Sequence, residues 1–244
     1  KAGRKPVRFN RRMIELPEDQ QAANRGYQQI RLMEYLNLMP VIQLVADYTE
    51  ADDIIAHVVQ SKHYEGWNKV IISSDKDFFQ LCADDISVYR PIQKKTLNKQ
   101  SILDEFKIHP KNFALARAIA GDKSDNLPGV RGAGLKTIAK RFPYLIREDI
   151  YEVGDIIRDC AMVGKKMKIH ENIAGSEQLL KDNYRIMQLY SPNIRPINRM
   201  MIDKALQDFE PFFSKINFTQ MLFEDDAGHL NFNDLQQVFR RIKR

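Results

Sequence analysis

The sequence predicts an α/β fold in which a parallel central sheet is flanked by helices and followed by a mostly helical C-terminal part. Residues 41–45 and 69–74 are short apolar runs typical of buried strands, and residues 51–59 between them have a helical pattern. Strand, helix and strand in that order imply a right-handed crossover and a parallel sheet. Beyond Gln100 the patterns are mainly helical. With 244 residues, 43% of them hydrophobic, the chain can bury the core of one domain, or of one domain with a small appendage.

Local patterns predict further elements on either side of this unit. Residues 18–37 have helix-forming composition, with Ile30, Met33 and Leu36 at helical spacing and Pro40 just beyond. Residues 77–81 predict a short helix. Residues 86–90 predict a third strand at the edge of the sheet, and a weaker strand pattern surrounds Ile194.

The chain is basic, with 38 Lys and Arg against 32 Asp and Glu and a formal net charge of +6. A positive field favours an anionic polymer as partner, although an ordinary soluble basic protein has the same balance. The first dozen residues are a basic run suited to phosphates or to a solvated arm.

The cysteine count and the hydropathy exclude several classes of protein. Cys82 and Cys160 are too few for a disulfide framework and match no zinc spacing, which favours a reducing, cytoplasmic compartment. No signal peptide is visible, and no apolar run reaches the roughly 18 residues that a membrane helix needs.

Seven carboxylates lie in three short clusters, each beside an element that can aim them inward. Acids at the start of a helix, such as Glu50, Asp52 and Asp53, are favoured by the helix dipole alone. However, Glu50 and Asp53 share a helix face, and the predicted strand before them directs that face to the end of the sheet. Like charges brought together must protonate or find cations, so the clusters predict a divalent metal site.

The other two clusters follow a predicted strand and a helical segment. Asp75 and Asp77 come after residues 69–74, and alternate residues of extended chain point the same way. Asp-x-Asp is also common in turns. Asp122 and Asp125 flank Lys123 and Ser124.

A glycine-rich segment after the third cluster is the strongest signal in the chain. Its glycines allow a tight hairpin whose backbone N–H groups approach a phosphate, and a helix opening near Leu135 adds its positive end. Such a hairpin binds a nucleic-acid backbone without contacting the bases. The alternative interpretation is an ordinary glycine-rich connection between two helices. The predicted DNA-binding residues here are Gly129, Val130, Arg131, Gly132, Ala133, Gly134, Lys136, Thr137 and Lys140.

These motifs, in this order and separation over about residues 1–145, resemble those of the structure-specific 5′-nucleases. The quoted matches are Glu50-Ala51-Asp52-Asp53, Ser74-Asp75-Lys76-Asp77, and Gly121-Asp122 through Asp125-Asn126 to Gly134. The family includes flap endonucleases, the 5′-exonuclease domains of bacterial DNA polymerase I, and phage 5′-exonucleases, among them the phage ribonuclease H. The resemblance implies a PIN-like core, a helix-three-turn-helix DNA-binding region and cleavage of DNA, or of RNA in RNA/DNA hybrids, at 5′ ends, flaps or junctions.

The resemblance also implies two Mg²⁺ ions, replaceable by Mn²⁺, and K⁺ at the hairpin. Glu50, Asp52 and Asp75 match the acids around the first ion, and Asp77, Asp122 and Asp125 those around the second, with Asp53 beside them. Lys1 and Arg4 match a catalytic Lys-x-x-Arg in the family's basic arch. Lys165 and Lys166 resemble its basic loop, although a solvated loop explains them equally well.

The implied organisation has four parts and one departure from the family. Residues 1–40 correspond to the arch and a helix, 41–100 to the catalytic core, 101–150 to the DNA-binding region and 151–244 to a mostly helical region. Family members begin with a strand ending in an aspartate and carry another aspartate before the arch. Neither has a counterpart here, so we expect the central strand and two metal ligands to lie outside this sequence or to be absent.

Two rival functions remain open at this stage. A junction-binding protein derived from the family would keep the hairpin and not cleave, and a ribonuclease of the wider PIN class would lack such a hairpin. The expected partner is DNA with a flap or junction. The protein is expected to act as a monomer in the cytoplasm of a bacterium or of a phage-infected host. Replication proteins are further candidate partners at the basic C-terminal tail.

Overall fold

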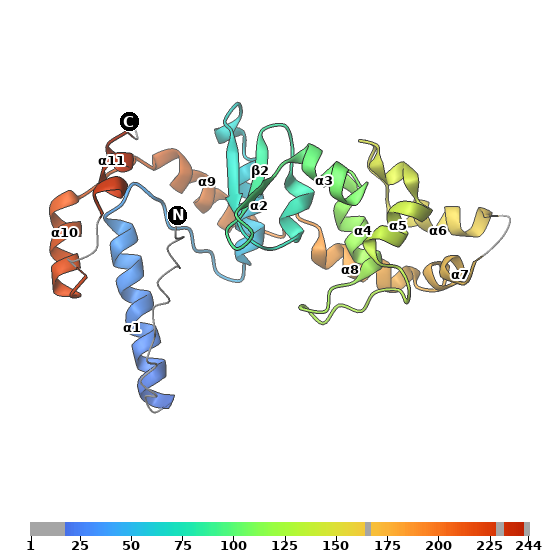
Figure 1. The fold of residues 1–244 in the computed structure, drawn as a ribbon, viewed down its shortest axis with the longest axis horizontal. Coiled ribbons are helices and arrows are strands. Elements are labelled where there is room, and N and C mark those ends of the chain that lie inside the picture. The colour runs from blue at the N-terminus through green and yellow to red at the C-terminus, as the bar shows by residue number, and fades with distance from the viewer. Residues whose placement is uncertain (1–17, 164–166, 228–231, 242–244) are drawn as a thin grey trace, which may run out of the picture. The chain divides into compact units, whose positions relative to one another are not determined.

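The computed structural model describes residues 18–163, 167–227 and 232–241, and the chain divides into two compact units. The larger unit is Val45–Gln207, and the smaller combines the described parts of Lys1–Leu44 and Asp208–Arg244 (Figure 1). Lys1, Arg4, Lys165 and Lys166 lie outside the described residues, so their predicted roles stay predictions.

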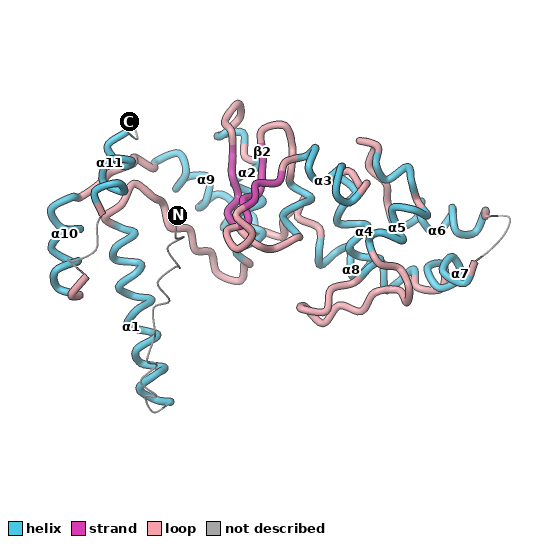
Figure 2. The backbone as a smooth tube through the Cα atoms, viewed as in Figure 1, coloured by secondary structure: helices cyan, strands magenta, loops and turns pink. Residues whose placement is uncertain are grey.

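The larger unit contains a three-stranded sheet with the order β1-β2-β3, formed by Lys69–Ile72, Ile86–Arg90 and Lys95–Leu97 (Figure 2). The first pair is parallel, with Lys69 opposite Ile86, and the second is antiparallel, with Val88 opposite Leu97. Helix α2 (Ala51–Gln60) precedes β1, and the short 3-10 helix η2 (Asp77–Leu81) connects β1 to β2. The acids of η2 therefore follow the carboxyl end of β1.

Helices make up the rest of the larger unit. They are α3 (Lys99–Phe106), α4 (Phe113–Ala120), α5 (Leu135–Arg141), α6 (Val153–Met162), α7 (Lys168–Ala174), α8 (Glu177–Met187) and α9 (Pro196–Asp208), with 3-10 turns η1 (Lys62–Tyr64), η3 (Pro110–Asn112) and η4 (Pro143–Ile146). One apolar cluster joins the sheet to these helices. At its centre the rings of Phe79 and Phe113 lie 5.6 Å apart, both fully buried. Burying each such side chain contributes about 1.5–3 kcal/mol.

The smaller unit contains α1 (Glu18–Asn37), α10 (Lys215–Glu224) and α11 (Asn233–Arg241). The Arg31 guanidinium Nε lies 3.0 Å from Asp225, whose carboxylate also accepts a 2.8 Å hydrogen bond from the Tyr35 hydroxyl. These contacts, with the Tyr35 and Phe218 rings 5.5 Å apart, fasten α1 to α10.

Three strand predictions were wrong. Residues 41–45 form no strand, because this segment links the two units and the Gln43 side chain instead donates to the Met33 carbonyl at the end of α1. Strand β2 lies in the middle of the sheet rather than at its edge, since the three-residue β3 was too short to recognise. The segment around Ile194 is irregular backbone.

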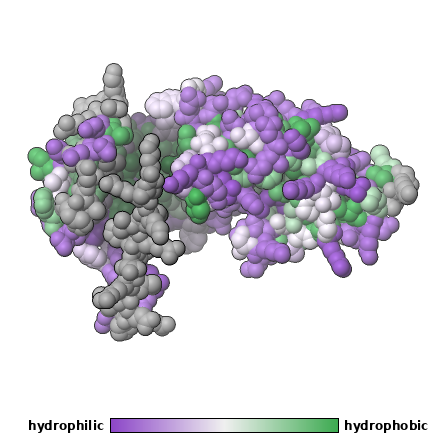
Figure 3. Space-filling model, in the orientation of Figure 1, coloured by the Kyte–Doolittle hydropathy of each residue, from purple (hydrophilic) through white to green (hydrophobic). Residues whose placement is uncertain are grey.

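The α/β class, the parallel strand pair and the mostly helical C-terminal part were predicted correctly. Polar side chains cover most of the visible surface of the larger unit (Figure 3). Among the described residues, no helix is both long enough and apolar enough to cross a membrane.

Candidate functional site

A close contact between two glycines builds the loop that carries the third acid cluster. Helix α4 ends at Ala120, and Gly121 turns the chain with φ +75°, in the region that favours glycine. A Cβ on Gly129 would lie 1.9 Å from the Ala120 carbonyl oxygen, and one on Gly121 would lie 2.2 Å from the Gly129 nitrogen. Only glycine at both positions lets the two backbone segments touch.

The loop between these glycines is closed by backbone hydrogen bonds. The amides of Asp122 and Leu127 donate to each other's carbonyls at 2.9 and 2.7 Å, and Val130 donates to the Ile119 carbonyl at 2.9 Å. The buried Asn183 of α8 donates to the carbonyls of Ala118 and Pro128, both at 2.9 Å. The loop is therefore held by α4 and α8 together.

Asp122 is held in its ionised form inside this loop. Its Oδ1 accepts hydrogen bonds from the Ser124 hydroxyl and backbone amide, and Arg117 pairs with its other oxygen. These contacts, the Ser124 hydroxyl first, lower the pKa of Asp122 to about 2. Asp122 therefore stays ionised at neutral pH.

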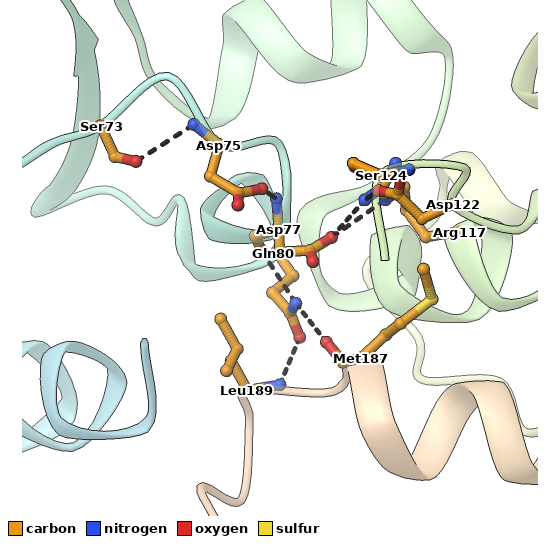
Figure 4. Close-up of polar contacts among 9 residues, drawn as sticks. All are labelled: Ser73, Asp75, Asp77, Gln80, Arg117, Asp122, Ser124, Met187 and Leu189. Carbon is orange, nitrogen blue, oxygen red and sulfur yellow. Dashed lines mark hydrogen bonds and ion pairs between the residues drawn. The ribbon is translucent and has the colours of Figure 1, made fainter. Parts of the chain in front are cut away.

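Arg117 is the residue that sequence reasoning missed. It lies on α4, is only 8% exposed, and its guanidinium bridges Asp122 and Asp77, the latter at 2.8 Å (Figure 4). Burial raises the pKa of Asp77 to about 6, although Arg117 acts in the opposite direction. The sequence signal was a single cation within the apolar run Phe113–Ala120, because a buried cation needs anionic partners.

Hydrogen bonds within η2 fix the second acid cluster. The Asp75 carboxylate accepts from the Asp77 amide at 2.8 Å, and the Asp75 amide donates to the Ser73 hydroxyl at 3.1 Å. The Gln80 side chain donates to the Met187 carbonyl and accepts from the Leu189 amide (Figure 4). The segment that follows α8 thus fastens η2 from its other side.

The first cluster, at the start of α2, faces acids from the other two. Partial burial raises the pKa of Asp52, and the like charges of Asp75, Glu50, Asp53 and Asp125 raise it further. Charges from all three clusters therefore act on Asp52. Their role as metal ligands stays a prediction. Asp53 differs, because its Oδ1 accepts a 2.9 Å hydrogen bond from the Asn193 amide.

The carboxylates do not form a closed metal cage. Within residues 18–163, 167–227 and 232–241, no three His, Cys, Asp or Glu side chains stand close enough to hold an ion. Asp77 and Asp122 share the single positive charge of Arg117, whereas the acids around Asp52 repel one another. Carboxylate oxygens such as those around Asp52 are the ligands that Mg²⁺ prefers. Asp77 and Asp122 can bind an ion only if Arg117 moves away from them.

The glycine hairpin presents open backbone beside this site. Val130 and Ala133 are buried and anchor it, whereas a Cβ added to Gly132 or to Gly134 would meet no atom within 4 Å. Gly132 adopts φ +84°. Arg131, Lys136 and Lys140 are exposed and Thr137 is half-buried. The hairpin and its basic side chains can therefore approach an anionic backbone.

The fold is an α/β domain in which acids begin α2 and follow the carboxyl end of β1. Residues 20–107 match the family model of the 5′-3′ exonuclease N-terminal resolvase-like domain.

Proteins of similar sequence include a 5′-3′ exonuclease and a DNA polymerase I. The 5′-3′ exonuclease of Aquifex aeolicus (strain VF5) is 33% identical over 106 residues, which are 43% of this chain and 37% of that protein. The thermostable DNA polymerase I of Thermus aquaticus is 35% identical over 109 residues, which are 45% of this chain and 13% of that protein. The matches thus span well under half of these relatives.

The phage T5 D15 protein, crystallised with metal ions, has a similar structure, with a TM-score of 0.63 and 24% identity over 80% of this chain and 73% of that one. This likeness confirms the fold.

Proposed function

We propose that the protein is a metal-dependent, structure-specific 5′ nuclease that hydrolyses DNA at 5′ ends, flaps or junctions. The observation that carries the proposal is the shared negative field of Asp52, Asp75 and Asp125, which come from three separate segments, beside an exposed glycine hairpin. Acids gathered in this way are unfavourable unless they bind cations. Relatives named DNA polymerase I suggest RNA primer removal in replication, and repair, as settings.

Glu50, Asp52 and Asp75 would hold the first Mg²⁺ or Mn²⁺, and they would have to draw closer to do so, because no three acids of the described residues stand within reach of one ion. Bound divalent ions lower the pKa of water and neutralise charge on a phosphate. Asp77 and Asp122 would hold a second ion only after Arg117 has moved, because its guanidinium now supplies the positive charge between them. Lys1 and Arg4 would add charge at the scissile phosphate.

The backbone of the hairpin Gly129–Gly134 would position duplex DNA. Lys136 and Lys140 would add positive charge. A K⁺ ion would bind between the backbone carbonyls of the hairpin and a phosphate of the DNA. Contacts to phosphates are independent of sequence and weaken steeply with salt. Lys165 and Lys166 would extend the grip. Support comes from the T5 D15 flap endonuclease, whose variant was crystallised with DNA and metal ions.

A second candidate is a protein that binds junctions without cleaving them. The Arg117 bridge favours it, because two carboxylates that match the second ion site are already paired within the protein.

The experiment that separates the two compares cleavage and binding of a 5′-flap DNA. Cleavage in Mg²⁺ or Mn²⁺, lost in EDTA, is expected for the nuclease. Asp75→Asn should lower the rate at least about 100-fold, the cost of losing one charge-stabilising group, with binding kept within about tenfold. Asp104→Asn, on the exposed face of α3, is the matched control and should cleave normally. Binding without cleavage by the unmodified protein would support the junction binder, and neither activity would reject both.

A further inference from the structure

Tyr48 is exposed beside the acid cluster although its backbone is unfavourable. It lies two residues before Glu50, is 87% exposed, and has φ 55°. A bulky side chain is rare in this left-handed region, so contacts around the residue must hold it there. The proposed reaction uses no part of this ring.

A buried asparagine bonds to the residues on both sides of Tyr48. Asn198 of α9 is 8% exposed, and its Nδ2 donates to the Asp47 carbonyl at 2.8 Å and to the Thr49 hydroxyl at 3.0 Å. The Asn193 amide bonds to Asp53 just beyond. The first turn of α9 and the segment before it therefore hold the loop that presents the tyrosine.

A cation lies against the Tyr48 ring. The Arg195 guanidinium carbon is 4.7 Å from the ring centroid, within the range of a cation–π contact. This contact restricts the ring, and most of its surface still faces solvent. A restrained, exposed aromatic ring is suited to stacking on another planar ring.

Tyr48 also lines a cavity of about 530 Å³ that reaches the acid cluster. This volume lies within the roughly 300–1,000 Å³ typical of small-molecule sites. Glu50 and Asp53 line it on the α2 side, and Asp182, Arg185 and Ile186 of α8 line it as well. The wall therefore carries three carboxylates and one guanidinium, a net negative charge that repels a phosphate. An uncharged planar group fits this cavity better.

We propose that Tyr48, backed by Arg195, is a stacking platform for one nucleobase of the DNA substrate. The inference rests on the proposed function, and it adds where the nucleotide lies. Two residues of chain span at most about 7 Å, so a base on Tyr48 belongs to a nucleotide close to the ion site proposed at Glu50. Stacking tolerates any base, which fits a site that recognises structure rather than sequence.

The test places the fluorescent base 2-aminopurine at successive positions across a 5′-flap junction, in EDTA so that no cleavage occurs. Stacking on Tyr48 should quench the fluorescence at one position next to the junction. Tyr48→Phe should keep the quenching, and Tyr48→Ala should abolish it and weaken binding by about tenfold. Tyr190→Ala, which removes another exposed tyrosine of the same unit, is the matched control and should behave as the unmodified protein.

An abasic nucleotide at the quenched position completes the test. On that DNA, Tyr48→Ala and the unmodified protein should bind equally, because neither can stack. If Tyr48→Ala quenches and binds intact DNA as the unmodified protein does, the platform is rejected while the nuclease proposal stands. If the unmodified protein neither binds nor cleaves the junction, the proposed function fails, and the platform fails with it.

Discussion

Replacing Gly129 with alanine should destabilise the larger unit more than replacing Gly132 or Gly134 in the same hairpin. The new Cβ would lie 1.9 Å from the Ala120 carbonyl oxygen and 2.2 Å from its carbon, so the two backbone segments must separate. Separation strains or breaks the hydrogen bond from Val130 to Ile119 and the pair between Asp122 and Leu127. Three bonds at about 1 kcal/mol each, with about 1–2 kcal/mol of overpacking, give a loss of about 4–5 kcal/mol.

Gly132 and Gly134 provide a graded comparison within the same hairpin. Neither added Cβ meets an atom within 4 Å, but Gly132 has φ +84° whereas Gly134 has φ −69°. Gly132→Ala should therefore cost about 1–2 kcal/mol, the penalty of left-handed backbone, and Gly134→Ala should lie within about 0.5 kcal/mol of the unmodified protein.

Urea unfolding followed by circular dichroism measures these free energies of unfolding. The expected order of loss is Gly129→Ala, then Gly132→Ala, then Gly134→Ala. Equal stability of Gly129→Ala and Gly134→Ala would show that the backbone contact does not support the loop of Asp122, and would refute this reasoning.

Three further predictions follow from single residues. Lys136→Ala should weaken junction binding for all sequences and reduce the slope of log affinity against log salt by about one. A fluorescence titration measures this slope. An unchanged slope would show that Lys136 does not contact the DNA. Burial lowers the pKa of His109, whose Nδ1 accepts the Lys111 amide. The unfolded chain then binds the proton more readily, so folding stability should fall as pH drops below about 6.5. His109→Gln should flatten that decline in urea titrations, and the exposed control His63→Gln should not. Arg117→Met should lower the free energy of unfolding by about 3–5 kcal/mol, because it leaves two buried carboxylates without a cation. Mn²⁺ should restore part of the lost stability, measured by thermal melting. If Mn²⁺ restores none, no ion binds between Asp77 and Asp122.

Local patterns predicted the elements whose signal lies within one segment. The helix over 18–37, the strand over 86–90 and the start of α2 at Ala51 agree with the structure, because periodicity and helix-start residues act over a few positions. In the predicted glycine hairpin, Gly132 adopts φ +84°, a conformation that glycine permits.

Pairings between distant segments were harder to predict. Residues 41–45 are as apolar as a strand, yet a strand also needs a partner, and Gln43 is used at the end of α1. Asp52 is influenced by acids of the other two clusters, but the Arg117 bridge joins residues 40 positions apart and has no periodic signal. The same is true of Asn198, which clamps residues about 150 positions away.

The central claim is that the acids around Asp52 form a divalent-cation site. Titration of the protein with Mn²⁺, followed by the loss of the free-ion electron paramagnetic resonance signal, tests it without requiring cleavage. We expect saturable binding that Asp52→Asn abolishes and Asp104→Asn leaves unchanged. A signal equal to that of Mn²⁺ in buffer, or equal binding by Asp52→Asn, would contradict the account.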